Sequence, residues 1–168
     1  MNIHQQKFFD LAEHRMKFGW FLLYKLPAAF FSGVRVIEID EKKCVTVVPF
    51  RWLTQNPFRS TYFASLAMAA EMSTGALALS NVYRRTPAVS MLVTRMEASF
   101  YKKAKGAIFF TCEQGHEFES AINDAVATGT PCHLTSQSTG INKDGEVVAA
   151  FSFTWSFKAK VANIQFAS

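Results

Sequence analysis

A single carboxylate in the middle of a long apolar stretch is the first candidate for chemistry. Glu71 is the only charged residue between Arg59 and Arg84, and small or apolar residues surround it. An ionised carboxylate inside such a segment is unfavourable unless it is paired or takes part in a reaction. Glu71 is therefore a candidate general base or nucleophile whose pKa burial would raise. The alternative is a structural carboxylate that accepts hydrogen bonds from Ser, Thr or Gln137.

The start of the same stretch supplies a second group of candidates. Ser60 or Thr61 is expected to cap a helix that begins here, since both hydroxyls can accept a backbone hydrogen bond. The first turn of a helix leaves N–H groups without a partner, and such groups bind anions. They could hold a developing oxyanion. The N–H groups in question lie around Tyr62, Phe63 and Ala64.

Other polar residues are weaker candidates for contact with a ligand. Ser73 and Thr74 lie within one turn of Glu71, and they either touch a substrate or water or simply fill small spaces. A set of basic residues could meet phosphate groups or form a solvated rim; its members are Arg84, Arg85, Lys102, Lys103 and Lys105. The spacing of His116 and His133 suggests neither a metal site nor a catalytic triad, so no metal is predicted.

The segment that positions Glu71 is expected to be a buried helix. Residues 60–79 are rich in alanine, leucine and methionine, and nothing breaks a helix before Gly75. The apolar positions run all the way round, which is typical of a helix buried on every side. The length also fits a membrane-spanning helix. We reject a membrane-spanning helix because the segment holds many polar residues besides Glu71. We predict instead a core helix wrapped by a sheet.

The rest of the chain predicts a largely antiparallel sheet and two further helices. The pattern favours strands over 34–39, 44–50, 88–103, 107–112, 132–141 and 146–158. It favours helices over 4–24 and 113–128, the second ended by Gly129, and a turn at Pro27. The stretch from Trp20 to Phe31 contains five aromatic residues, including both of its ends. This segment packs on the domain or at a subunit contact, or else forms a lid over an acyl pocket or a membrane-surface helix.

Composition places these elements in one α+β domain. The chain has 168 residues, of which 49% are hydrophobic and 17 are phenylalanine, so we expect a single domain over 1–168 with a helical extension over 1–32 and a core over 33–160. The net charge of +5 fits an anionic ligand, nucleic acid or plain solubility. The three cysteines form no CxxC pair and are expected to be buried thiols. No signal peptide is evident, so we expect a cytoplasmic protein.

This order of elements resembles the hot-dog fold, in which a curved sheet wraps a central helix. The local match is to thioesterases of the phenylacetyl-CoA type, which carry an Asn, then His-Gly-Gly at the helix start, then an acidic residue nine positions after the His. Here Asn56 stands in the loop, Tyr62-Phe63-Ala64 takes the place of His-Gly-Gly, and Glu71 lies nine positions after Tyr62. The resemblance covers most of residues 33–158 and is closest to an uncharacterised branch of the superfamily.

The resemblance implies an acyl-CoA thioesterase with coenzyme A as part of the substrate and no separate cofactor. Glu71 then acts as general base or nucleophile, Asn56 orients the loop, and Tyr62 stands in the place of the histidine. The substrate lies against Phe63, Ala64, Ser73 and Thr74, and its phosphates meet Arg84 and Arg85. The resemblance also implies a homodimer or a dimer of dimers, formed by edge-to-edge pairing of two sheets, in which the helix N-terminus and Glu71 of one site come from different subunits.

A second hypothesis stays open. A non-catalytic hot-dog protein that binds an acyl-CoA or another acyl ligand also fits, because the His-Gly-Gly residues are missing here. A role with nucleic acid rests on basic charge alone, and no nucleic-acid partner and no membrane span are expected.

Overall fold

The central helix α4 (Phe63–Val82) is the core around which the other elements pack. The computed structural model describes residues 3–160 of the chain. Buried residues lie on all sides of α4, as the apolar pattern predicts. Its buried hydroxyls are satisfied locally or by the sheet: Ser80 donates to the Leu77 carbonyl, and the Ser73 hydroxyl lies 2.8 Å from the Ala70 carbonyl and 2.7 Å from Ser138 Oγ. These hydrogen bonds leave few buried polar side chains unpaired among the described residues.

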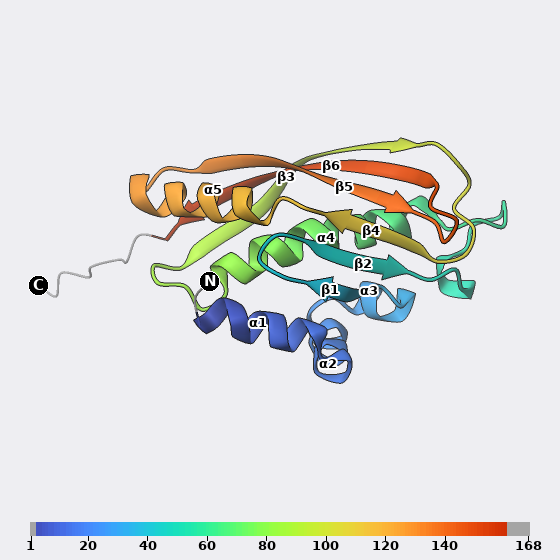
Figure 1. Cartoon of the computed structure of the whole chain (residues 1–168), viewed down its shortest axis with the longest axis horizontal. Coiled ribbons are helices and arrows are strands. Elements are labelled where there is room, and N and C mark those ends of the chain that lie inside the picture. Colours follow the sequence, from blue (N-terminus) through green and yellow to red (C-terminus); the bar gives the residue numbers. More distant parts are fainter. Residues whose placement is uncertain (1–2, 161–168) are drawn as a thin grey trace, which may run out of the picture.

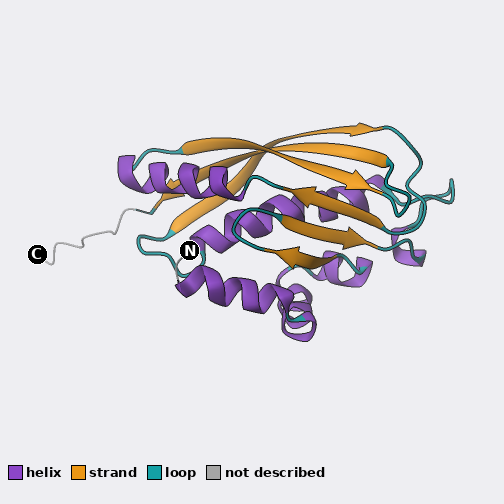
Figure 2. Ribbon diagram, viewed as in Figure 1, coloured by secondary structure: helices purple, strands orange, loops and turns teal. Residues whose placement is uncertain are grey.

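A six-stranded antiparallel sheet curves around this helix (Figure 1, Figure 2). Its spatial order is β1-β2-β4-β5-β6-β3, so that β1 and β3 are the two edges. The strands are β1 (Arg35–Ile39), β2 (Cys44–Val48), β3 (Val89–Phe100), β4 (Ile108–Cys112), β5 (Cys132–Ile141) and β6 (Val147–Ala159). The six strands that the sequence predicts are all confirmed, with small shifts of their ends. The fold is the hot-dog architecture that the sequence resembles.

The long edge strand β3 contains a bulge that changes which alternate residues face the core. The pairing with β6 slips between Val93 and Arg95, which leaves Thr94 as the extra residue. Before the bulge, Met91 and Val93 pair with buried residues of β6 and face the core. After it, the core-facing residues are Met96, Ala98 and Phe100. The sequence pattern predicted one uninterrupted alternation that continued through Ser99 and Tyr101, and this is wrong because a bulge shifts the period of two by one residue.

Three helices lie at the N-terminus (Figure 1). They are α1 (Ile3–Glu13), α2 (Arg15–Lys25) and α3 (Pro27–Ser32). Helices α1 and α3 pack on α4, and α2 packs on α1 and α3. The prediction of one helix over 4–24 is wrong, because the chain breaks at His14, whose backbone is extended. The break lets the two halves bury different faces, Phe8 and Phe9 in α1 and Phe18 and Leu22 in α2. Tertiary packing here overrides the local preference for helix.

The remaining helix, α5 (Gly115–Thr128), packs on the sheet and ends where predicted. Gly129 caps it in the left-handed conformation with φ of 68°, which favours glycine. Cys44 and Cys112 are buried and Cys132 is half-buried, and all three are free thiols. Along residues 3–160, α4 alone is long and apolar enough to cross a membrane, and it lies mostly buried within the fold.

Candidate active site

Glu71 lies in an apolar pocket between α4, β3 and the N-terminal helices. The pocket has a volume of about 310 Å³. Apart from Glu71 its walls are apolar side chains and Gly75, chiefly Phe8, Phe18, Phe21, Leu22 and Leu26 from the N-terminal segment, Met91, Leu92 and Val93 from β3, and Trp155 from β6. Gly75 leaves room for the carboxylate, since a Cβ there would lie 2.9 Å from Glu71 Oε1. Helices α1 and α2 therefore cover the carboxylate with apolar surface.

The Glu71 carboxylate has no protein partner within residues 3–160. No hydrogen bond or ion pair reaches its oxygens, and burial raises the pKa of the carboxyl above its ordinary value. The alternative in which Gln137 holds Glu71 is wrong. Gln137 is exposed, and its amide donates to Ser152 Oγ while its backbone N–H donates to Gln114. A half-buried, unpaired carboxylate with a raised pKa has the properties of a general base.

The hydroxyls beside Glu71 are engaged in the structure of the helix. Thr74 Oγ1 donates to the Glu71 carbonyl oxygen at 3.0 Å and accepts from Trp155 Nε1 at 3.2 Å. Ser73 is fully buried and bonded to Ser138. Neither hydroxyl lines the pocket. Their predicted contact with substrate stays a prediction, and Thr74 also fixes the Trp155 ring that forms one wall of the pocket.

The N-terminus of α4 offers two free backbone donors. Tyr62, and not Ser60 or Thr61 as predicted, is the N-cap residue, and no side chain caps the helix. The Tyr62 N–H is not free, because it donates to the Thr54 carbonyl at 2.7 Å. In the described part of the chain, the N–H groups of Phe63 and Ala64 have no acceptor. These two groups can receive an anion or a developing oxyanion.

A second pocket, of about 350 Å³, opens beside this helix end. The sequence-predicted residues Asn56, Tyr62 and Phe63 line it, together with Thr61, Phe100, Lys102 and Lys103, among others. Thr61 is only 4% exposed, and its hydroxyl has no hydrogen-bond partner in the structure. A buried hydroxyl without a partner is unfavourable unless a ligand or water completes it. Sequence reasoning did not find Thr61 and Phe100 as site residues.

Asn56 holds the loop that leads into α4. Its side-chain oxygen accepts from the backbone N–H of Phe58 at 3.0 Å and of Ser60 at 3.2 Å. Its backbone carbonyl accepts from Arg59, which has a positive φ of 57°. Asn56 therefore shapes the loop as an Asx turn does. The role of Asn56 in catalysis stays a prediction.

The two halves of the expected site lie apart within one chain. Tyr62 and Glu71 are nine residues apart, and a helix rises about 1.5 Å per residue, so roughly 13 Å separates them along the axis. Each lines its own pocket. Within one chain, the free N–H groups of the helix N-terminus and the Glu71 carboxylate thus lie at different pockets.

The predicted basic residues do not gather at either pocket, except for two lysines. Arg84 lies over the Tyr83 ring at 5.4 Å, and Arg85 donates to Asn123 Oδ1 at 2.7 Å. Both lie beyond the C-terminal end of α4, far from its N-terminus. Lys102 lines the second pocket and forms an ion pair with Glu146. No cluster of His, Cys, Asp or Glu among the described residues could hold a metal ion.

Comparison with known proteins places these features in a family context. The family described as a domain of unknown function (DUF4442) matches residues 15–157. No curated protein matches the sequence. Among solved structures, a probable thioesterase from Pseudomonas aeruginosa is 20% identical with a TM-score of 0.72, over 95% of this chain and 99% of that one.

Two further solved structures show the same architecture. A protein of unknown function from Chlorobaculum tepidum is 15% identical with a TM-score of 0.73, over 86% of this chain and 94% of that one. The PaaI protein of Escherichia coli, from the phenylacetic acid degradation operon, is 13% identical with a TM-score of 0.60, over 90% and 96%. At such identities the likeness establishes the hot-dog fold and leaves the chemistry to the residues.

Proposed function

Because the chain belongs to the family of domains of unknown function DUF4442, an uncharacterised branch with the thioesterase-like hot-dog fold, we propose that it is a cytoplasmic acyl-CoA thioesterase. The observation that carries the proposal is the Glu71 carboxylate, which is half-buried, unpaired among the described residues and open to an apolar pocket. A structural carboxylate would have partners, whereas a general base needs a free lone pair and a raised pKa.

In the proposed reaction, Glu71 accepts a proton from a water molecule that attacks the thioester carbonyl. The carbonyl oxygen gains negative charge, and the N–H groups of Phe63 and Ala64 stabilise it. The C–S bond then breaks, and the proton held by Glu71 passes to the departing thiolate of coenzyme A. Direct attack by the carboxylate, followed by hydrolysis of the anhydride, uses the same residues.

Edge strand β3 could bring the carboxylate and the N–H donors together by pairing with β3 of a second copy of the chain. Met96 and Phe100 lie on its core face yet are 48% and 51% exposed, although their neighbours on β6 are buried. The Phe100 ring packs T-shaped on the buried Phe151, at 5.6 Å between ring centroids, and about half of its surface stays exposed. An edge strand that has a partner on one side only and an uncovered apolar face is suited to pair with another chain. We infer a homodimer formed through β3.

An antiparallel pairing of β3 with its copy has a direct consequence for the site. In such a pairing, the beginning of one strand lies beside the end of the other. Met91 belongs to the Glu71 pocket and Phe100 to the pocket at the helix N-terminus, and both lie on the core face of β3. Pairing about Met96, with Thr94 as the extra residue of the bulge, sets Met91 of one subunit against Phe100 of the other. The carboxylate of one subunit then meets the free N–H groups of its partner.

The competing function is non-catalytic binding of an acyl-CoA or another acyl ligand. The entrance of α4 favours it, because Tyr62 and Phe63 pack edge to face there at 4.8 Å and occupy space that a Gly-Gly pair would leave open. Both aromatic rings are partly exposed. In this case the two pockets bind the ligand and Glu71 contributes no turnover.

A hydrolysis screen over acyl-CoAs of varied chain length distinguishes the two functions. We expect at least one acyl-CoA to release free thiol in proportion to enzyme concentration, because the inferred pairing through β3 would bring the N–H donors and the carboxylate together. Free thiol is measured with a chromogenic disulfide, and binding of the same compounds is measured by calorimetry. Saturable binding without release of thiol, for every acyl-CoA that binds, would favour the binding protein.

Tyr62→Phe tests whether the tyrosine hydroxyl donates to the thioester oxygen. The Tyr62 hydroxyl has no hydrogen-bond partner in residues 3–160, so its removal leaves the fold unchanged. Loss of one oxyanion donor lowers kcat by roughly 10²-fold. We expect a fall of this order with unchanged Tm. Unchanged kinetics would assign the ring to packing alone.

A further inference from the structure

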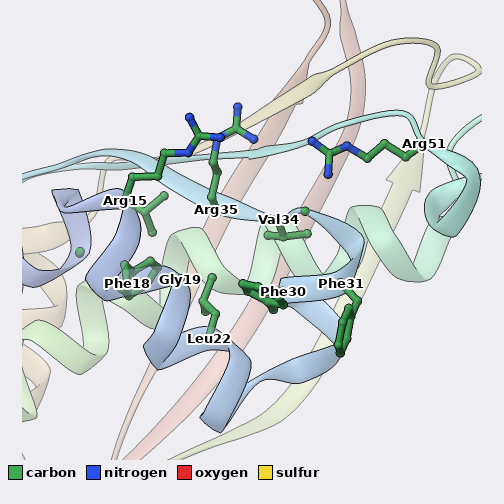
Figure 3. Close-up of a pocket in the computed structure, with 12 residues that line it drawn as sticks. Arg15, Phe18, Gly19, Leu22, Phe30, Phe31, Val34, Arg35 and Arg51 are labelled. Carbon is green, nitrogen blue, oxygen red and sulfur yellow. The ribbon is translucent and has the colours of Figure 1, made fainter.

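A third pocket lies between α2, α3 and β1 and has a different character from the two described above (Figure 3). Its volume is about 360 Å³, within the range of roughly 300–1,000 Å³ typical of small-molecule sites. It shares Phe18 and Leu22 with the Glu71 pocket and contains none of the proposed catalytic residues. Its floor is buried and apolar: Ala12, Phe18, Leu22, Val34 and Val36.

Three arginines stand around the mouth of this pocket. Arg15 comes from α2, Arg35 from β1, and Arg51 from the turn before the short helix η1 (Trp52–Thr54). In Figure 3 the guanidinium groups of Arg15 and Arg35 lie above the apolar floor, and the side chain of Arg51 extends toward them. The residues that line the pocket include no acid. None of the three arginines takes part in an ion pair among residues 3–160.

The guanidinium group of Arg51 lies close to the backbone of Gly33 in the pocket wall. Gly33 adopts a φ of 74°, and a Cβ there would lie 2.9 Å from Arg51 Nη1 and 3.0 Å from Pro49. The arginine therefore packs against the glycine in space that another residue would fill. Three like charges brought around one cavity repel one another, and the nearby low-dielectric floor weakens screening. An anion bound among them removes this repulsion.

We propose that this pocket binds an amphiphile that carries a phosphate group on an apolar chain. A phosphate dianion presents several acceptor oxygens, which suit the forked donors of several guanidinium groups. The apolar floor then takes the chain, which explains why the basic mouth leads into an apolar cavity and not to a flat basic surface. The proposal does not depend on whether Glu71 hydrolyses thioesters, because no residue of that reaction lines the pocket.

Calorimetric titration of the full chain with decyl phosphate, below its micelle concentration, tests the proposal. We expect one saturable site per chain. Arg15→Gln, Arg35→Gln and Arg51→Gln should each weaken binding by about tenfold to a hundredfold, since each removes hydrogen bonds to a charged group. Lys17→Gln is the matched control, because Lys17 is on the same helix as Arg15, carries the same charge and does not line the pocket. It should change the Kd by less than about twofold.

A second variant tests the apolar part of the site and keeps all three arginines. Gly19 lines the pocket on α2, and the nearest side-chain atom to a Cβ there is 3.8 Å away on Phe30. Gly19→Leu should therefore fold, because leucine favours helix over glycine, and its side chain should fill the cavity. We expect decyl phosphate to bind at least about tenfold more weakly and inorganic phosphate to bind as before.

The comparison ligands decide what the site recognises. Inorganic phosphate and decanol should each bind far more weakly than decyl phosphate, since each supplies only half of the contacts. Equal affinity for inorganic and decyl phosphate, or an equal loss in Lys17→Gln, would reduce the pocket to a region of general positive charge and overturn the proposal. Tighter binding of decanoate than of decyl phosphate would overturn the assignment of phosphate.

Discussion

Glu71→Gln is expected to reduce kcat/KM for the best acyl-CoA by about 10²- to 10⁴-fold, the contribution typical of a general base. Glutamine keeps the size of the side chain and cannot accept the proton. Glu71→Ala should give a similar loss. In both variants the fold should persist, because no described residue depends on the carboxylate for a hydrogen bond or an ion pair. Steady-state kinetics and thermal melting measure the two effects.

The same substitution has a defined effect on stability as pH changes. Burial raises the pKa of Glu71 in the folded state, so the folded protein binds the proton more tightly than the unfolded chain. Below the unfolded pKa both states are protonated and Glu71 carries no penalty. As pH rises through the folded pKa, the wild type loses stability that Glu71→Gln keeps. The Tm difference in favour of the variant should thus be present at neutral pH and vanish in acid.

Glu119→Gln provides the control, since this glutamate is exposed on α5 and makes no contact with either pocket. It should leave both kinetics and Tm unchanged. Wild-type hydrolysis by Glu71→Gln would make the carboxylate structural and end the proposed mechanism. A Tm advantage that persisted unchanged into acid would show that burial of the charge is not its cause.

Met96→Lys is expected to convert a dimer into a monomer and to remove hydrolysis with it. Met96 lies on the uncovered core face of β3, and a lysine there would place charge in the inferred contact between subunits. A buried, unpaired charge at an interface is strongly unfavourable. We expect the mass from light scattering at micromolar concentration to halve. Activity should fall by at least about 10²-fold if each site needs the N–H donors of its partner.

Met16→Lys is the matched control for this variant. It makes the same chemical change at an exposed methionine of α2, away from β3 and outside the pockets described above. Mass and activity should both be retained. A wild-type protein that is monomeric, or a Met96→Lys variant that is monomeric and fully active, would contradict the shared site. The second result would show that hydrolysis needs no group from the partner subunit.

The sequence predicted the architecture well where the pattern was local. The all-round apolar character of α4 and the clean alternation of β6 each specify how an element is buried, and both were confirmed. The break at His14 was not predicted, because the period of three and four continues across it in the sequence. The chain breaks between α1 and α2 because the two helices bury different faces. Which face each helix buries depends on tertiary contacts with residues that are distant in the sequence.

The candidate site was predictable only in part, for a similar reason. Glu71 is recognisable because it is a lone charge in an apolar run. Thr61 and Phe100 join the second pocket only through the fold, since β3 brings residue 100 beside the start of α4. Arg84 and Arg85 are near Glu71 in sequence terms but follow the C-terminal end of α4. Helix length, not composition, places them out of reach.

The extra residue in β3 divides this edge strand into two parts, in which core-facing residues have odd numbers before the bulge and even numbers after it. Up to Val93 the core-facing side chains of the strand are covered within their own subunit, and after Thr94 the core-facing side chains of Met96 and Phe100 are left about half exposed. One inserted residue shifts a period of two by half, so it changes the destination of every side chain that follows. Deletion of Thr94 alone would carry Met96, Ala98 and Phe100 to the opposite face. A single insertion thus keeps the side chains that are buried within the subunit and those of the inferred subunit contact on the same face of one continuous strand.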